Sequence, residues 1–126
     1  MTSREAVSSF RDMYPVEFTD DVLTGWVSEL EGMIINEIVL THDGAKDGAS
    51  SFRGITQTEG FDSPLTASFP YDGVYADYLK MKCDEAHSDT VRYQSSSAIF
   101  GASYSNFADF YNRTHAPLGA GKLKTR

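Results

Sequence analysis

The stretch that decides the fold is Tyr71–His115, which reads YDGVYADYLKMKCDEAHSDTVRYQSSSAIFGASYSNFADFYNRTH. Its aromatic side chains recur at helical spacing. One face of a 3.6-residue helix collects Tyr71, Tyr75, Tyr78, Leu79, Ala86 and Tyr93. A second set continues with steps of four, three and four: Phe100, Tyr104, Phe107 and Tyr111. The pattern predicts helical packing, with Tyr75, Phe100 and Phe107 in the core.

Three consecutive serines, Ser95 to Ser97, divide this stretch. Serine competes for backbone hydrogen bonds and prefers helix caps, so we favour two helices, at about 72–94 and 96–113. The aromatic spacing carries across the serines without a slip. One continuous helix over 73–112, about 60 Å long, therefore stays open as an alternative.

Two helices are predicted upstream. Thr2 followed by Glu5 fits a capping box for a helix at 3–14, and Pro15 follows its end. Thr19 fits the N-cap of a helix at 20–41. The apolar stripe of that helix consists of Leu23, Trp26, Val27, Leu30, Met33, Ile34 and Ile38. The fold class is therefore all-α, a small bundle of about four helices in one domain, 1–126.

The segment 43–70 lacks helical periodicity. Glycines at 44, 48, 54 and 60 favour turns, and 52–58 is compatible with a short strand or hairpin arm. A loop this long often reaches outward, so we expect it to contact a neighbouring subunit. After Pro117 the chain is glycine-flanked and basic, which predicts a flexible tail over 117–126.

Charge and composition limit the possible functions. The net charge of −7 argues against a large nucleic-acid surface. Lys122, Lys124 and Arg126 place three positive charges in the last five residues; they form either a solvated terminus or a partner-contacting tail. The single cysteine, Cys83, excludes an internal disulfide and favours a small buried side chain in a reducing cytosol. No apolar run is long enough for a membrane span.

Known catalytic patterns are missing from the sequence. There is no glycine-rich phosphate loop and no nucleophile elbow. His42, His87 and His115 are far apart and predict three unrelated surface histidines. We therefore expect no enzyme, no metal and no cofactor.

A second face of the 20–41 helix suggests another contact. Ser28, Gly32, Ile35 and Val39 line this face, with small residues first and β-branched residues after. Its partner is either another part of the same domain or another subunit.

The residues also carry a family resemblance. The segment RDMYPVEFTDDVLTGWVSELEGMIINEIVLTHDG, with its W-x-x-E-L-(D/E)-G helix, resembles a pattern in small phage and prophage proteins of Gram-positive bacteria. The segment FPYDGVYADYLKMKCDEAHSDTVRYQSSSAIFGASYSNFADFYNRTH, closing on Tyr-Asn-Arg-Thr-His, is similar to their second half. Together these segments cover about 8–42 and 68–117. The family is that of head–tail connector (adaptor) proteins of tailed bacteriophages. Where it commonly has Tyr-Asn-Asn, this chain has Tyr93-Gln94-Ser95.

The resemblance implies a structural protein of the virion, assembled in the cytoplasm of the bacterial host. It implies self-association into a ring beneath the portal protein, contact with tail or stopper proteins, and passage of DNA through the lumen. An isolated subunit of this kind is expected to leave apolar side chains exposed at its interfaces. The candidates are Ile35, Val39, Tyr78 and Met81.

Two other functional hypotheses remain. A helical DNA-packaging or regulatory protein requires a basic face, and the only basic cluster in the sequence is the terminal tail. A small ligand-binding bundle requires polar groups converging on a tyrosine-lined pocket, which the sequence does not assemble.

Overall fold

The computed structural model describes residues 1–42 and 52–115. It contains four α-helices, α1 (Ser3–Met13), α2 (Asp20–Glu37), α3 (Gly73–Ala86) and α4 (Thr90–Thr114), and a 3₁₀ turn, η1 (Val39–Thr41). No strand forms within these two described ranges. The all-α prediction is confirmed.

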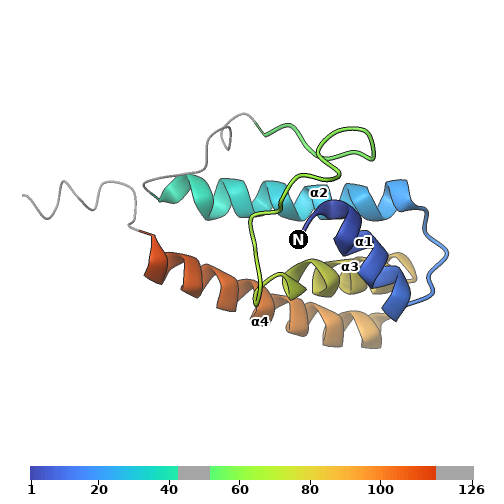
Figure 1. Ribbon diagram of the computed structural model, residues 1–126. Helices are drawn as coiled ribbons and strands as arrows, with labels where there is room; N and C mark the ends of the chain where they lie inside the picture. The colour runs from blue at the N-terminus through green and yellow to red at the C-terminus, as the bar shows by residue number, and fades with distance from the viewer. Residues whose placement is uncertain (43–51, 116–126) are drawn as a thin grey trace, which may run out of the picture.

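The helices are arranged with α3 at the centre of the packing (Figure 1). The α3 helix runs antiparallel to α4, and it also packs against α1 and α2. Both α2 and α4 point toward the same end of the bundle, whereas α1 crosses near the opposite end. The green connection that precedes α3 passes over α2 before it reaches the start of that helix.

The predicted caps of the first two helices are present. The Thr2 hydroxyl accepts from the Glu5 amide at 3.2 Å, and the Glu5 carboxylate accepts from the Thr2 amide at 2.9 Å. The Thr19 hydroxyl accepts from the Val22 amide at 3.3 Å. Each bond satisfies an amide that has no partner inside its own helix.

The predicted helix boundary at the serines is wrong. The chain turns at His87–Asp89, so the expected helices at 72–94 and 96–113 are 73–86 and 90–114. Ser88 has a positive φ of 55°, and the Asp89 carboxylate caps α4 by accepting from the Arg92 amide at 3.1 Å. The Ser96 hydroxyl donates to the Arg92 carbonyl at 2.9 Å, which lets it stay inside the helix.

The two aromatic sets meet where α3 and α4 pack. Tyr78 lies 5.0 Å from Phe100 between ring centroids, and Tyr71 stacks on Phe110 at 4.6 Å. Tyr75 and Phe107 are fully buried, as predicted, whereas Phe100, also assigned to the core, is partly buried and packs against it. The aromatic spacing therefore encodes the α3–α4 hairpin.

Residues 52–70 lie on the bundle, and the prediction that they reach outward is wrong for this part of the loop. Ile55, Leu65 and Ala67 are buried in the core. The Ile55 amide donates to the Ser28 hydroxyl at 2.9 Å. Gly54 has a φ of +113° and approaches the same hydroxyl so closely that a Cβ would lie 3.2 Å from it.

Replacing Phe107 with alanine tests this core. Phe107 is 2% exposed, so its loss should lower the free energy of unfolding by about 3–5 kcal/mol in urea denaturation. Phe69→Ala is the matched control, because Phe69 is 86% exposed, and it should cost less than about 0.5 kcal/mol. Equal losses in the two variants would contradict the core assignment.

Candidate functional site

A buried carboxylate on α2, Glu31, is the polar centre of the molecule. It is 3% exposed. One of its oxygens accepts from the Thr66 amide at 3.0 Å and the Thr66 hydroxyl at 2.8 Å. The other accepts from the Tyr75 hydroxyl at 2.8 Å. These three donors are neutral, so the charge is balanced by hydrogen bonds from groups fixed in place.

Tyr75 links this carboxylate to the connection. Its hydroxyl donates to Glu31 and accepts from the Ala67 amide at 3.0 Å. Burial, followed by the negative charge of Glu31, raises the pKa of Tyr75 far above its ordinary value. The Tyr75 hydroxyl therefore stays protonated and donates to Glu31. We call the hydrogen-bonded group of Glu31, Thr66, Ala67 and Tyr75 the Glu31 clasp.

A second polar cluster closes the end of the bundle at which α2 and α4 meet. His42 Nδ1 lies 2.6 Å from the Ile38 carbonyl oxygen, and Nε2 lies 2.8 Å from Asn112 Oδ1. The Tyr111 and His115 rings stack at 3.8 Å, and Tyr111 meets His42 edge-on at 4.9 Å. We call His42, Tyr111, Asn112 and His115 the helix-end cluster.

The helix-end cluster corrects one expectation. His42 is buried at 5% exposure, and its ring lies 6.4 Å from that of His115. The prediction of unrelated surface histidines is therefore wrong for this pair, because the two rings lie in one cluster and His42 is buried. Nδ1 contacts the Ile38 carbonyl at the end of α2 within the same segment, and Nε2 contacts the Asn112 side-chain amide on α4, so Nε2 is the ring nitrogen that joins two helices.

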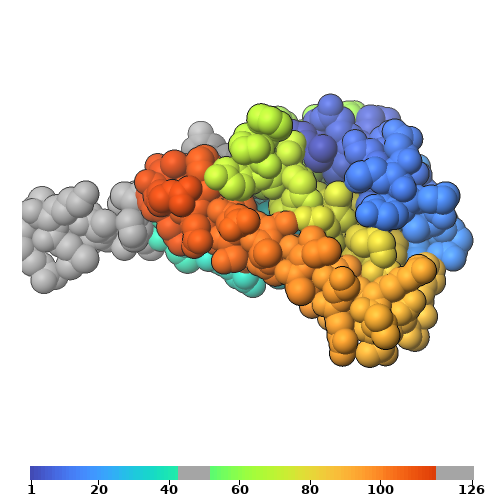
Figure 2. All heavy atoms as spheres, turned by 90° about the horizontal axis from the view of Figure 1, so that it is seen from below, coloured from blue at the N-terminus to red at the C-terminus, as the bar shows by residue number. Residues whose placement is uncertain are grey.

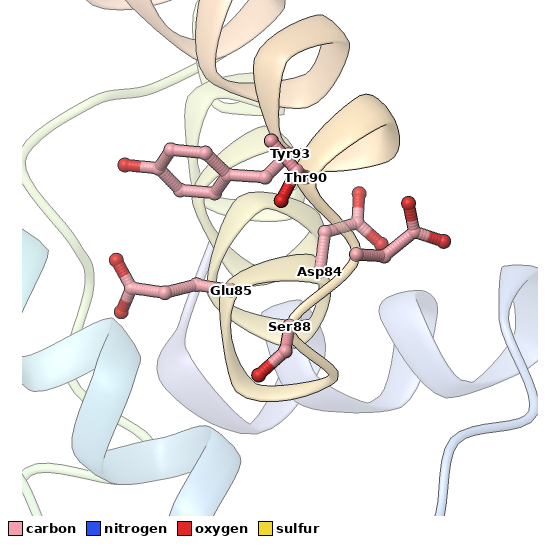
Figure 3. Close-up of a pocket in the computed structure, with 6 residues that line it drawn as sticks. Asp84, Glu85, Ser88, Thr90 and Tyr93 are labelled. Atoms are coloured by element: carbon pink, nitrogen blue, oxygen red, sulfur yellow. The ribbon is translucent and has the colours of Figure 1, made fainter.

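An acidic pocket of about 160 Å³ lies at the turn between α3 and α4 (Figure 3). It is lined by Asp84, Glu85, Ser88, Asp89, Thr90 and Tyr93. Figure 3 shows the Asp84 and Glu85 side chains pointing to opposite sides of α3. Asp84 bonds to Lys80 through both oxygens at 2.7 Å, and Asp89 caps α4. The carboxylates are thus committed to local structure and do not converge on one point.

Residues 1–42 and 52–115 contain no group of three or more histidine, cysteine or acidic side chains placed to hold a metal ion. Cys83 is buried, as predicted, and burial raises the pKa of its thiol to about 11. The helices in this part of the chain also include none that is long and apolar enough to cross a membrane.

The candidate interface residues lie mainly inside the subunit. Ile35, Val39 and Tyr78 are buried, so the expectation that they are exposed is wrong. The Tyr78 hydroxyl donates to Glu29 at 3.0 Å while its ring packs on Phe100. Met81 is partly buried against the core. The second face of α2 is covered by the connection, since Phe52 lies 3.7 Å from the Cβ position of Gly32.

The remaining candidates, Lys122, Lys124 and Arg126, lie outside the described residues. Sequence reasoning missed Glu31, His42 and Asn112. For Glu31 a signal existed, because it lies one turn after Val27 and one residue after Leu30 on the apolar side of its helix. A charged side chain at such a position predicts a buried group with dedicated partners.

No protein-family model matches this chain, and neither a curated protein nor a solved structure is similar enough to match it.

The Asp84–Lys80 pair predicts how stability changes with pH. Burial acts to raise the pKa of Asp84, but the bonded ammonium outweighs it, so the pKa of Asp84 lies below its usual value. A lowered folded pKa stabilises the fold above the unfolded pKa of about 4, and this stability is lost as the pH falls through the folded value. Asp84→Asn should cost about 1–3 kcal/mol at pH 7 and should flatten the acid decline.

Urea unfolding at a series of pH values from neutral to acid measures both effects. Asp12→Asn is the control, because Asp12 is exposed on α1, and it should leave the curve almost unchanged. If the Asp84→Asn curve runs parallel to that of the parent chain through the acid range, Asp84 does not carry the effect.

Proposed function

We propose that this chain is a non-enzymatic structural subunit of the head–tail connector of a tailed bacteriophage or prophage. In this proposal it forms part of a ring beneath the portal protein, joins capsid to tail and helps to retain packaged DNA. The observation that carries the proposal is that residues of the motifs behind the family resemblance make the buried contacts that hold this fold together.

The first motif, W-x-x-E-L-E-G, occupies Trp26–Gly32 of α2. Its second glutamate is Glu31, whose carboxylate holds residues 66 and 75. The closing motif, Tyr-Asn-Arg-Thr-His, contributes Tyr111, Asn112 and His115 to the helix-end cluster. Residues that make such contacts fit a protein whose activity is to hold a shape and dock to partners.

The charge of the chain supports the same function. A net charge of −7 lets an acidic lumen repel the phosphate backbone, so that DNA slides without being held. The competing nucleic-acid hypothesis requires clustered free cations. In the described residues, Arg4, Arg11 and Lys80 each form an ion pair with an aspartate, at 2.5–2.7 Å. These pairs favour the connector over a DNA-binding surface.

The ligand-binding alternative has less support. The pocket at the α3–α4 turn is acidic, and the carboxylates of Asp84 and Asp89 are committed to Lys80 and to the α4 N-terminus. Between α3 and α4 most of the tyrosine rings are packed, with Tyr75 fully buried, and the pocket of about 200 Å³ at the start of α3 has a single tyrosine, Tyr71, in its lining. A tyrosine-lined binding cavity is therefore not favoured.

Co-sedimentation with a portal protein of the same phage or prophage tests the proposal. The connector function predicts that the chain sediments with assembled portal rings, at one copy or a fixed multiple per portal subunit, and is present in purified tailed particles. The control is a mixture with an unrelated ring protein of similar mass, with which it should stay in the supernatant. Failure to sediment with the portal, together with absence from the particles, would refute the proposal.

A further inference from the structure

The outward side of α4 is an exposed helix face. The helix packs on α3 along one side, and Figure 2 shows α4, the orange band, crossing the lower surface of the molecule uncovered. We call this surface the outer α4 face. Its exposed residues are Val91, Gln94, Ser95, Ala98, Ile99, Gly101, Ala102, Ser105, Asn106 and Asp109.

Between Arg92 and Asp109 this face has no charge over more than four helical turns. The sequence contains no charged residue between Arg92 and Asp109, whereas the exposed sides of α1 and α2 carry acidic residues such as Asp12, Asp21 and Glu37. A helix that faces only water normally carries charged side chains on that side. Val91 is instead 78% exposed and Ile99 is 55% exposed. The face therefore has the composition of a helix-packing surface.

The spacing of the residues along the face fits a second helix. Val91, Ser95, Ala98, Ala102, Ser105 and Asp109 recur at alternating steps of four and three. That is the spacing of a seam along which two helices pack side by side. The distance between two packed helices depends on the side chains at the contact, and these side chains are short.

The charges at the two ends of the run indicate the occupant. Arg92 precedes the uncharged run and Asp109 follows it. If two copies of α4 lie antiparallel with the middles of their runs aligned, Arg92 of each copy faces Asp109 of the other. The helix dipoles are then also opposed, which is favourable. Two chains of net charge −7 repel each other. Because the run between Arg92 and Asp109 is uncharged, two copies can meet along it without like charges in contact.

We propose that a second copy of this chain docks antiparallel on the outer α4 face, with Arg92 of each copy paired to Asp109 of the other. The contact is isologous, because the same patch is used on both copies. It goes beyond the connector function and does not depend on it. Arg92 pairs with its neighbour Asp89 at 3.5 Å, but both side chains are exposed, at 74% and 40%, so this weak surface pair can be exchanged for Asp109 of the other copy.

The dimer is measured by sedimentation equilibrium of the full chain from about 1 µM to about 1 mM, a range of Kd typical of weak specific complexes. Ala102→Glu places a carboxylate at the centre of the face and should raise Kd by at least about 100-fold. Ser8→Glu is the matched control, because it adds the same charge at an exposed position of α1, and Kd should change less than about 3-fold. Circular dichroism confirms that both variants fold.

A charge exchange tests the register. Arg92→Asp should weaken the dimer about 10-fold, and so should Asp109→Arg. The double variant should return Kd to within about 3-fold of the parent. Within one helix these two positions are about 25 Å apart, so rescue must occur between copies.

Each contrary result overturns the inference. These results are a monomer over the whole range, a dimer or larger ring unaffected by Ala102→Glu, or a double variant no tighter than the weaker single variant. None of them bears on co-sedimentation with a portal protein, so the two proposals fail separately.

Discussion

The carboxylate of Glu31 is the interaction on which the rest of the structure depends. It is buried, and the amide and hydroxyl of Thr66 and the hydroxyl of Tyr75 surround it. A buried charge is tolerated only when such donors are all in place. This requirement fixes the connection to α2 and sets the position at which the chain enters α3. The α3–α4 hairpin then follows from the aromatic packing.

The two polar clusters hold different parts of the molecule together, one at its centre and one at the end where α2 and α4 meet. The Glu31 clasp fixes the connection against α2 and α3, and the helix-end cluster joins α2 and α4 through His42 and Asn112. Both use buried hydrogen bonds to specify one arrangement of the helices, which hydrophobic packing alone leaves less well defined. The outer α4 face has no comparable partner in the described part of the subunit. The proposed structural function, with the proposed second copy docked along that face, would account for both features.

The sequence predicted the elements better than their connections. Capping at Thr2 and Thr19 was readable because the capping bond is local, and the aromatic spacing of α3 and α4 was readable because it reports one long helix–helix contact. The turn at Ser88 was missed because the helix boundary was assigned to the serines at 95–97 instead. Serine is compatible with both a helix cap and a helix interior. Ser96 stays inside α4 because the Arg92 carbonyl, one turn earlier, accepts its hydroxyl.

The candidate site was less predictable, for a physical reason. Ile35 and Val39 lie on a second face of their helix, beside its main apolar stripe, and they were assigned to an exposed interface together with Tyr78 because the family resemblance implies exposed apolar side chains. The sequence gives no measure of how far a long irregular segment covers such a face, and here residues 52–70 supply the second layer. The same limit hid the helix-end cluster, since His42 and Asn112 are 70 residues apart.

Hydrogen exchange of the Thr66 and Ala67 amides tests the central claim most directly. Both amides lie outside any helix, and both donate to buried oxygens of the Glu31 clasp. If the clasp fixes the connection, they exchange within about tenfold of core amides such as that of Ile34, because they open only when the fold opens. If instead they exchange as fast as the exposed Gln57 in the same connection, the clasp does not hold the segment and the account is wrong.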